Sequence, residues 1–135
     1  MLFQYTWRLV VDGTKTQTRR IKKKDEHFED GRVFTFDTYS FKERTRWEVG
    51  KTYAVQPARG KSAIGRIRIT GIREQDVREI SDADVRAEGF AAKADFLKTW
   101  TQMHDKPAFY LMADLQNRPA ERYQAWVLEF QLVRS

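Results

Sequence analysis

The 135-residue sequence contains no cysteine. This absence excludes disulfide bonds, thiolate zinc sites and cysteine nucleophiles, and it favours the reducing cytoplasm as the location. No run approaches the roughly 18 apolar residues that a membrane span requires, so we expect no membrane association. The N-terminal residues lack a basic lead-in and a small-residue cleavage site, and therefore do not resemble a signal peptide.

Histidine and the turn-forming residues are also scarce, with two histidines, three prolines and seven glycines. So few prolines and glycines leave no candidate linker, and the length predicts a single domain over residues 1–135, with a monomer as the default. His27 and His104 lie far apart and lack paired carboxylates, which argues against a histidine metal site. We predict no metal and no cofactor, with a carboxylate-bound magnesium ion as the remaining alternative.

Two common catalytic motifs are missing as well. Gly60-Lys61-Ser62 resembles the end of a P-loop, but Val55 stands where the first glycine belongs. None of the four serines lies in a G-x-S-x-G motif. The sequence therefore supports neither a P-loop nucleotide site nor a serine hydrolase of that type.

Positive charge is present in excess and is unevenly distributed. The formal net charge is +6, yet residues 1–73 hold 17 basic and 8 acidic side chains, whereas residues 74–135 hold 8 basic and 11 acidic ones. This division predicts an electropositive face built from the first half of the chain. Nucleic acid is the commonest partner for such a face, and the alternative is a basic surface that only confers solubility.

The pattern of apolar residues predicts an α+β domain. Strands are expected at Thr16–Ile21, Val33–Tyr39, Thr52–Gln56, Ala63–Ile72 and Arg122–Val133. Helices are expected at Tyr5–Asp12, from Ser81 to near Gly89, and at Ala91–His104, with residues 105–119 irregular. About five to six strands with two to three flanking helices indicate a barrel-like domain, and Trp100 and Trp126 are assigned to its core.

The densest functional signal is residues 13–24, where six of the ten residues from Lys15 to Lys24 are basic. Cations in such a stretch can follow a phosphate backbone, and a second pair flanks Gly60 in a tight turn. The predicted phosphate-binding residues are Arg19, Arg20, Lys22, Lys23, Arg59 and Lys61. The alternative is a solvated strand and turn without a ligand.

Residues 27–47 interleave aromatic and basic side chains, as single-strand nucleic-acid binders do. Half or more of these aromatic residues are expected to fill the core. Tyr39 and Phe41, beside Ser40 and Lys42, are the predicted exposed residues on which bases could stack.

The string Gly13-Thr14-Lys15-Thr16-Gln17-Thr18-Arg19-Arg20 resembles the G-x-K-T-x-T-x-R signature of the ASCH domain family, relatives of the PUA-like RNA-binding barrels. The resemblance continues at residues 49–72, 80–90 and 125–130, and so spans nearly the whole chain. It implies a PUA-like mixed β-barrel with helices at its side and a central cleft. Residues 25–48 form an insertion relative to the shorter members.

Some bacterial ASCH proteins are amidohydrolases that remove the acetyl group from N(4)-acetylcytidine, whereas others are connected with RNA binding or RNA cleavage. The hydrolases use a Lys, a Thr and a Glu, and these match Lys15, Thr18 and Glu88 here. The resemblance therefore implies an RNA or nucleoside ligand in a basic cleft, with a metal-free amidohydrolase as one possibility. A non-catalytic RNA-binding module and a metal-assisted ribonuclease are the alternatives.

The chemistry of these residue types fits amide hydrolysis. A threonine hydroxyl becomes nucleophilic when a base takes its proton, and a desolvated lysine beside other cations can be a neutral amine. Arg19 and Arg20 would lower the pKa of Lys15 if they lie close to it, and Glu88 could orient the lysine or donate to the leaving amine. Because residues three apart lie on opposite faces of a regular strand, Lys15 and Thr18 meet only if the chain bends at Thr16 or Gln17.

Overall fold

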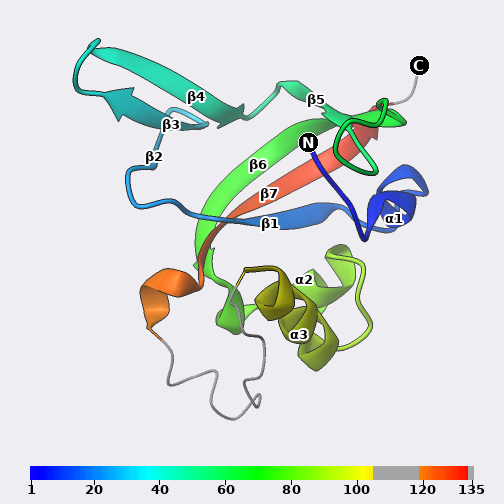
Figure 1. Ribbon diagram of the computed structural model, residues 1–135. Helices are drawn as coiled ribbons and strands as arrows, with labels where there is room; N and C mark the ends of the chain where they lie inside the picture. The colour runs from blue at the N-terminus through cyan, green and yellow to red at the C-terminus, as the bar shows by residue number, and fades with distance from the viewer. Residues whose placement is uncertain (105–118, 134–135) are drawn as a thin grey trace.

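The computed structural model describes residues 1–104 and 119–133, which form an α+β fold of seven strands and three α-helices (Figure 1). Most of the predicted irregular segment, residues 105–118, lies outside the described residues. In chain order, the elements are α1 (Trp7–Val11), β1 (Gln17–Ile21), β2 (His27–Glu29), β3 (Arg32–Asp37), β4 (Lys42–Glu48), β5 (Thr52–Val55), β6 (Gly65–Asp76), α2 (Asp82–Ala87), α3 (Lys93–His104) and β7 (Gln124–Val133), with 3-10 turns η1 (Val77–Glu79) and η3 (Ala120–Arg122).

The strands form two antiparallel sheets. The larger sheet has the order β1-β7-β6-β5, and the smaller has the order β2-β3-β4. Strands β6 and β7 are paired over ten positions, from Arg66 opposite Val133 to Asp76 opposite Gln124. Their alternating side chains direct Ile67 and Ile69 into the core, where both are fully buried, while Arg66 and Arg68 face outward.

The predicted mixed barrel of five to six strands needs correction, because the described residues contain seven strands and no closed barrel. Strands β1 and β5 each pair on one side only, so both remain sheet edges. An isolated parallel bridge between Leu2 and Gln56 lays the N-terminal segment beside β5. The two sheets meet in one core cluster, formed by Val33 and Trp47 of the small sheet and Ile69, Trp126 and Leu128 of the large one.

Helices α2 and α3 cover one end of the large sheet, whereas α1 packs near its other end (Figure 1). Ser81 begins α2 as predicted, because its hydroxyl accepts a hydrogen bond from the Asp84 main-chain nitrogen at 3.1 Å. Trp100 of α3 packs with Phe96 and Tyr123 in a core cluster, and Trp126 is 2% exposed, so the assignment of both tryptophans to the core is confirmed. None of the described helices is long and apolar enough to cross a membrane.

A buried pocket around Lys15 and Glu88

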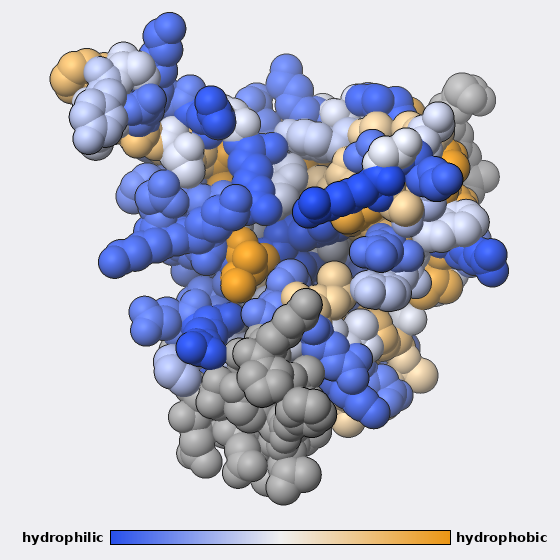
Figure 2. Space-filling model, in the orientation of Figure 1, coloured by the Kyte–Doolittle hydropathy of each residue, from blue (hydrophilic) through white to orange (hydrophobic). Residues whose placement is uncertain are grey.

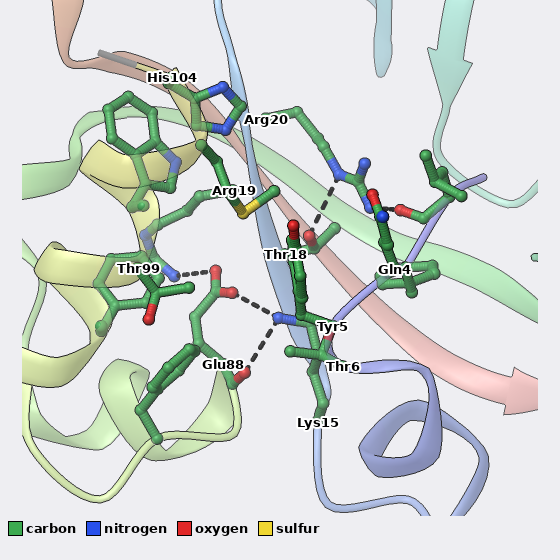
Figure 3. Close-up of a pocket in the computed structure, with 16 residues that line it drawn as sticks. Gln4, Tyr5, Thr6, Lys15, Thr18, Arg19, Arg20, Glu88, Thr99 and His104 are labelled. Atoms are coloured by element: carbon green, nitrogen blue, oxygen red, sulfur yellow. Dashed lines mark hydrogen bonds and ion pairs between the residues drawn. The ribbon is translucent and has the colours of Figure 1, made fainter. Parts of the chain in front are cut away.

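A pocket lies where the N-terminal segment, β1, the end of α2 and the inner face of α3 meet (Figure 3). Of the residues singled out from the sequence, it brings together Lys15, Thr18, Arg19, Arg20 and Glu88. Its other lining residues are Leu2, Phe3, Gln4, Tyr5, Thr6, Phe90, Phe96, Thr99, Trp100, Met103 and His104. Charged groups therefore line the β1 side of the pocket, and aromatic side chains form much of the side built by α3.

Local backbone structure places Lys15 and Glu88 side by side. Gly13 has a φ of 84°, which glycine adopts without strain, and the chain turns there so that Lys15 lies just before β1. Because Lys15 lies outside the strand, strand alternation does not separate its side chain from Thr18. The Thr16 main-chain nitrogen donates to the Ala87 carbonyl oxygen at 2.8 Å, which ties this segment to the end of α2.

Lys15 and Glu88 form a buried ion pair. The Lys15 Nζ lies 2.6 Å from Glu88 Oε1 and also donates to the Glu88 main-chain oxygen at 3.0 Å. The side chains are 4% and 3% exposed. Desolvation lowers the pKa of Lys15, Glu88 opposes that shift, and Arg20 and Arg19 add smaller contributions that lower it. The arginines act in the predicted direction, but burial is the larger cause.

Arg19 has no exposed side-chain surface, and its guanidinium is surrounded by acceptors. Nη1 donates to Glu88 Oε2 at 2.9 Å and to Gln17 Oε1 at 3.0 Å. Nε and Nη2 both donate to Gln75 Oε1, and Nη2 also reaches Asp84 Oδ2 at 3.1 Å. The predicted phosphate contact does not fit this arrangement, because every guanidinium nitrogen already has a protein partner.

Thr18 and Arg20 form a second polar unit in the pocket. Thr18 is 5% exposed, and its Oγ1 accepts a hydrogen bond from Arg20 Nε at 3.2 Å. Arg20 Nη2 donates to the Leu2 carbonyl oxygen at 2.7 Å, and its guanidinium lies 4.8 Å from the centre of the Phe3 ring. Desolvation lowers the pKa of Arg20 to about 10, which leaves the group charged at neutral pH.

The aromatic wall includes residues that the sequence did not identify as site residues. Phe90 and Phe96 pack edge to face with ring centres 5.5 Å apart, and His104 lies 4.5 Å from the Trp100 ring centre. Desolvation, followed by the charge of Arg20, lowers the pKa of His104. Trp100 Nε1 is a buried donor with no acceptor among the described residues. The spacing of the apolar residues on α3 indicated a core face, and the same face reaches the pocket.

The other predicted binding residues lie outside this pocket. Lys22 is paired with Glu74 at 3.0 Å and lies over the Trp126 ring, while Lys23 follows it in the loop after β1. Arg59 and Lys61 are exposed in the β5–β6 turn, where Gly60 has a φ of 74°.

Tyr39 and Phe41 are 96% and 78% exposed at the tip of the β3–β4 hairpin. Figure 2 shows this hairpin standing out from the body at the upper left, with apolar and hydrophilic side chains adjacent at its tip. The predicted exposure of both rings is confirmed, and base stacking on them stays a prediction.

Solved structures share this fold at low sequence identity. Protein EF3133 from Enterococcus faecalis V583, with the family model DUF984, matches with a TM-score of 0.60 and 17% identity over 94% of this chain and 66% of its own length. Hypothetical protein PH0355 matches with a TM-score of 0.59 and 13% identity over 98% and 96%. The ASCH domain from Lactobacillus crispatus JV V101 matches with a TM-score of 0.57 and 19% identity over 96% and 74%.

These matches define an ASCH-domain-like fold for the chain. No protein-family model and no curated protein matches the sequence.

Proposed function

We propose that this pocket binds a cytidine-type nucleoside and hydrolyses the acetyl amide of N(4)-acetylcytidine. The observation that carries the proposal is the buried Lys15–Glu88 ion pair in the same pocket as the Thr18 hydroxyl. Amide hydrolysis by covalent catalysis needs a nucleophile, a base that can exchange its proton, and groups that stabilise the developing charge. The three side chains and Arg20 supply those functions without a metal ion.

In the first step, the neutral amine of Lys15 takes the proton of the Thr18 hydroxyl as Oγ1 adds to the acetyl carbonyl carbon. The hydrogen bond from Arg20 to Thr18 Oγ1 favours the deprotonated oxygen. The carbon–nitrogen bond then breaks, and the N(4) nitrogen receives the proton from Lys15. Cytidine leaves, and the acetyl group remains on Thr18 as an ester.

In the second step, water gives a proton to Lys15 and adds to the ester carbonyl. Thr18 leaves the tetrahedral carbon and recovers its proton from Lys15, so acetate is released and the pocket returns to its starting state. Glu88 keeps the lysine in place throughout, through contacts from both its carboxylate and its main-chain oxygen. Phe90, Phe96 and Trp100 supply apolar surface for the base ring on the opposite wall.

The test is chromatography of purified protein incubated with N(4)-acetylcytidine. We expect cytidine and acetate in equal amounts from the wild-type chain, and none from Thr18→Val, which keeps the side-chain shape but removes the hydroxyl. Thr18→Ser retains a hydroxyl and should keep part of the rate. No cytidine from folded wild-type protein, or an unchanged rate in Thr18→Val, would contradict the proposal.

A non-catalytic RNA-binding module is the second candidate, and a separate observation favours it. Residues 49–73 contain six basic side chains and no acidic one, and they fold into the β5–β6 hairpin with its flanking residues. Within the described part of the chain, only Arg73 of these six takes part in an ion pair.

For metal-assisted RNA cleavage, residues 1–104 and 119–133 offer no group of three His, Cys, Asp or Glu placed to hold a metal ion.

A further inference from the structure

Arg19 occupies a position that the G-x-K-T-x-T-x-R signature leaves open, between its last threonine and its arginine. The side chain nevertheless reaches the centre of the site, because Nη1 lies 2.9 Å from Glu88 Oε2. Lys15 holds the other oxygen of the same carboxylate at 2.6 Å. Glu88 is therefore a single buried anion shared by two buried cations, one on each oxygen (Figure 3).

This cluster carries an excess of positive charge. Lys15, Arg19 and Arg20 contribute three positive charges against the two negative charges of Glu88 and Asp84, and Asp84 is also paired with Arg73. Burying unbalanced charge is costly, and the site can reduce that cost by releasing a proton. Arginine does not lose its proton in proteins, so Lys15 is the cation that can become neutral.

We propose that Arg19 is a positioning residue that holds Glu88 as a carboxylate, so that Lys15 can release its proton to solvent and serve as the base. When Lys15 becomes neutral, Arg19 and Glu88 remain a matched pair, and no anion is left buried alone. Without Arg19, the same deprotonation would leave Glu88 with no directly paired cation and only the more distant charge of Arg20 to offset its desolvation, which is unfavourable. The role of Lys15 as a base rests on the proposed function, whereas the effect of Arg19 on the Lys15 pKa can be measured without it.

Further contacts keep Arg19 directed at Glu88. Gln17 and Gln75 accept from its guanidinium, and Asp84 holds one terminal nitrogen at 3.1 Å while pairing with Arg73 at 2.7 Å. These partners hold the Arg19 guanidinium in one orientation, as expected of a preorganised site. The remaining titratable groups that line the pocket around Lys15 are Arg20 from β1, His104 from α3 and Tyr5 from the N-terminal segment.

The test is a direct titration of the Lys15 amine by NMR on protein labelled at the lysine side chains, with the Lys15 signal assigned from its loss in Lys15→Arg. In the wild-type chain, we expect the Lys15 pKa below its ordinary value of 10.5. Arg19→Gln keeps hydrogen-bond donors but removes the charge, and it should raise the Lys15 pKa above the wild-type value. Arg19→Lys retains a positive charge and should stay close to wild type.

Arg73→Gln is the matched control, because Arg73 contacts Asp84 but not Glu88. It should leave the Lys15 titration unchanged. An Arg19→Gln protein that folds with an unchanged or lower Lys15 pKa would overturn the inference, as would a shift of equal size in Arg73→Gln. If Arg19→Gln does not fold, the titration of the wild-type chain tests the inference instead. A wild-type Lys15 pKa at or above the ordinary value of 10.5 would show that the cluster does not favour the neutral amine, and it would overturn the role proposed for Arg19.

Activity provides a second and separable readout. Where the wild-type chain hydrolyses N(4)-acetylcytidine, the pH at which kcat/KM rises should move upward in Arg19→Gln by the same amount as the Lys15 titration. A wild-type chain that shows no hydrolysis refutes the proposed function, and the titration still decides the role of Arg19. The proposed hydrolysis and the role of Arg19 can therefore be refuted independently of each other.

Discussion

Lys15 is the residue on which the proposed chemistry depends. A lysine in water keeps its proton at neutral pH, but here burial favours the neutral amine while Glu88 favours the ammonium. The net effect lowers the pKa of Lys15, so its neutral amine forms at a lower pH than that of a lysine in water. The same contacts fix the position of the amine, so its protonation and its orientation have a common structural origin.

This shift gives a prediction for the pH dependence of hydrolysis. The active form contains neutral Lys15, so kcat/KM should rise as the pH increases through the Lys15 pKa and reach a plateau below pH 10.5. A rate profile between pH 6 and about pH 10 is the measurement. A rate that falls across this range would show that protonated Lys15 is the active form, and the assignment of Lys15 as base would then be wrong.

The sequence predicted the residue types of the site better than their individual contacts. Lys15, Thr18, Arg20 and Glu88 share one pocket because the chain turns before β1, a feature that a strict strand pattern would have excluded. Arg19 was predicted to bind phosphate from charge alone. Its buried contacts depend on Gln75 and Asp84, which are distant in sequence, so local reasoning could not reveal them.

At the scale of elements, the end of α2 determines where Glu88 lies. Gly89 follows Glu88 with a φ of 95°, and a Cβ added there would lie 2.7 Å from Leu9 Cδ1 of α1. A glycine at this position ends the helix and allows α1 to pack closely. The location of the carboxylate in the pocket therefore depends on a residue that has no side chain.

We predict that Gly89→Ala lowers the free energy of unfolding by about 1–3 kcal/mol and reduces hydrolysis, because both strain and the Leu9 contact act on the segment that carries Glu88. Gly50→Ala is the matched control, since Gly50 also has a positive φ, 90°, but a Cβ added there would have no neighbouring atom within 4 Å. Gly50→Ala should lower the free energy of unfolding through backbone strain alone and leave the rate of hydrolysis unchanged. Thermal unfolding and product chromatography measure the two effects, and equal results for both variants would contradict this role of Gly89.

Most strands and helices followed from periodicity, and the failures have a clear cause. Strands β1, β3, β5, β6 and β7 and all three helices lie close to their predicted ranges. Strand β4 was missed because Lys42–Arg46 are exposed or only partly buried, so no apolar alternation marks them. Strand β2 is three exposed residues paired with β3. Strands without a buried face carry little period-two signal, and the sheet arrangement was mispredicted for the same reason.

At the scale of the whole molecule, the basic segment 49–73 contributes no residue to the pocket. The acid-free segment 49–73 forms the β5 edge of the large sheet, whereas Lys22 is neutralised by Glu74. If the protein binds RNA, affinity should fall steeply with salt because each phosphate contact releases counterions. The substitutions Arg59→Gln, Lys61→Gln and Arg66→Gln together should flatten the slope of affinity against salt.

Lys22→Gln is the control for that measurement and should change the slope less, because its charge is already paired. Fluorescence anisotropy with a labelled single-stranded RNA at several salt concentrations gives the slopes. Binding that is undetectable at low salt would count against the RNA-binding alternative, and so would a slope that none of these substitutions alters.

The most direct test of the central claim compares Lys15→Arg with Lys15→Ala, measuring N(4)-acetylcytidine turnover and ligand affinity in the same preparations. Arginine keeps the positive charge but cannot release its proton, so it can still pair with Glu88 and preserve the pocket, and it cannot act as a base. We predict that turnover is abolished in both variants, while the arginine variant retains most of the affinity for cytidine. Substantial turnover by a folded Lys15→Arg protein would contradict the role of Lys15 as the base.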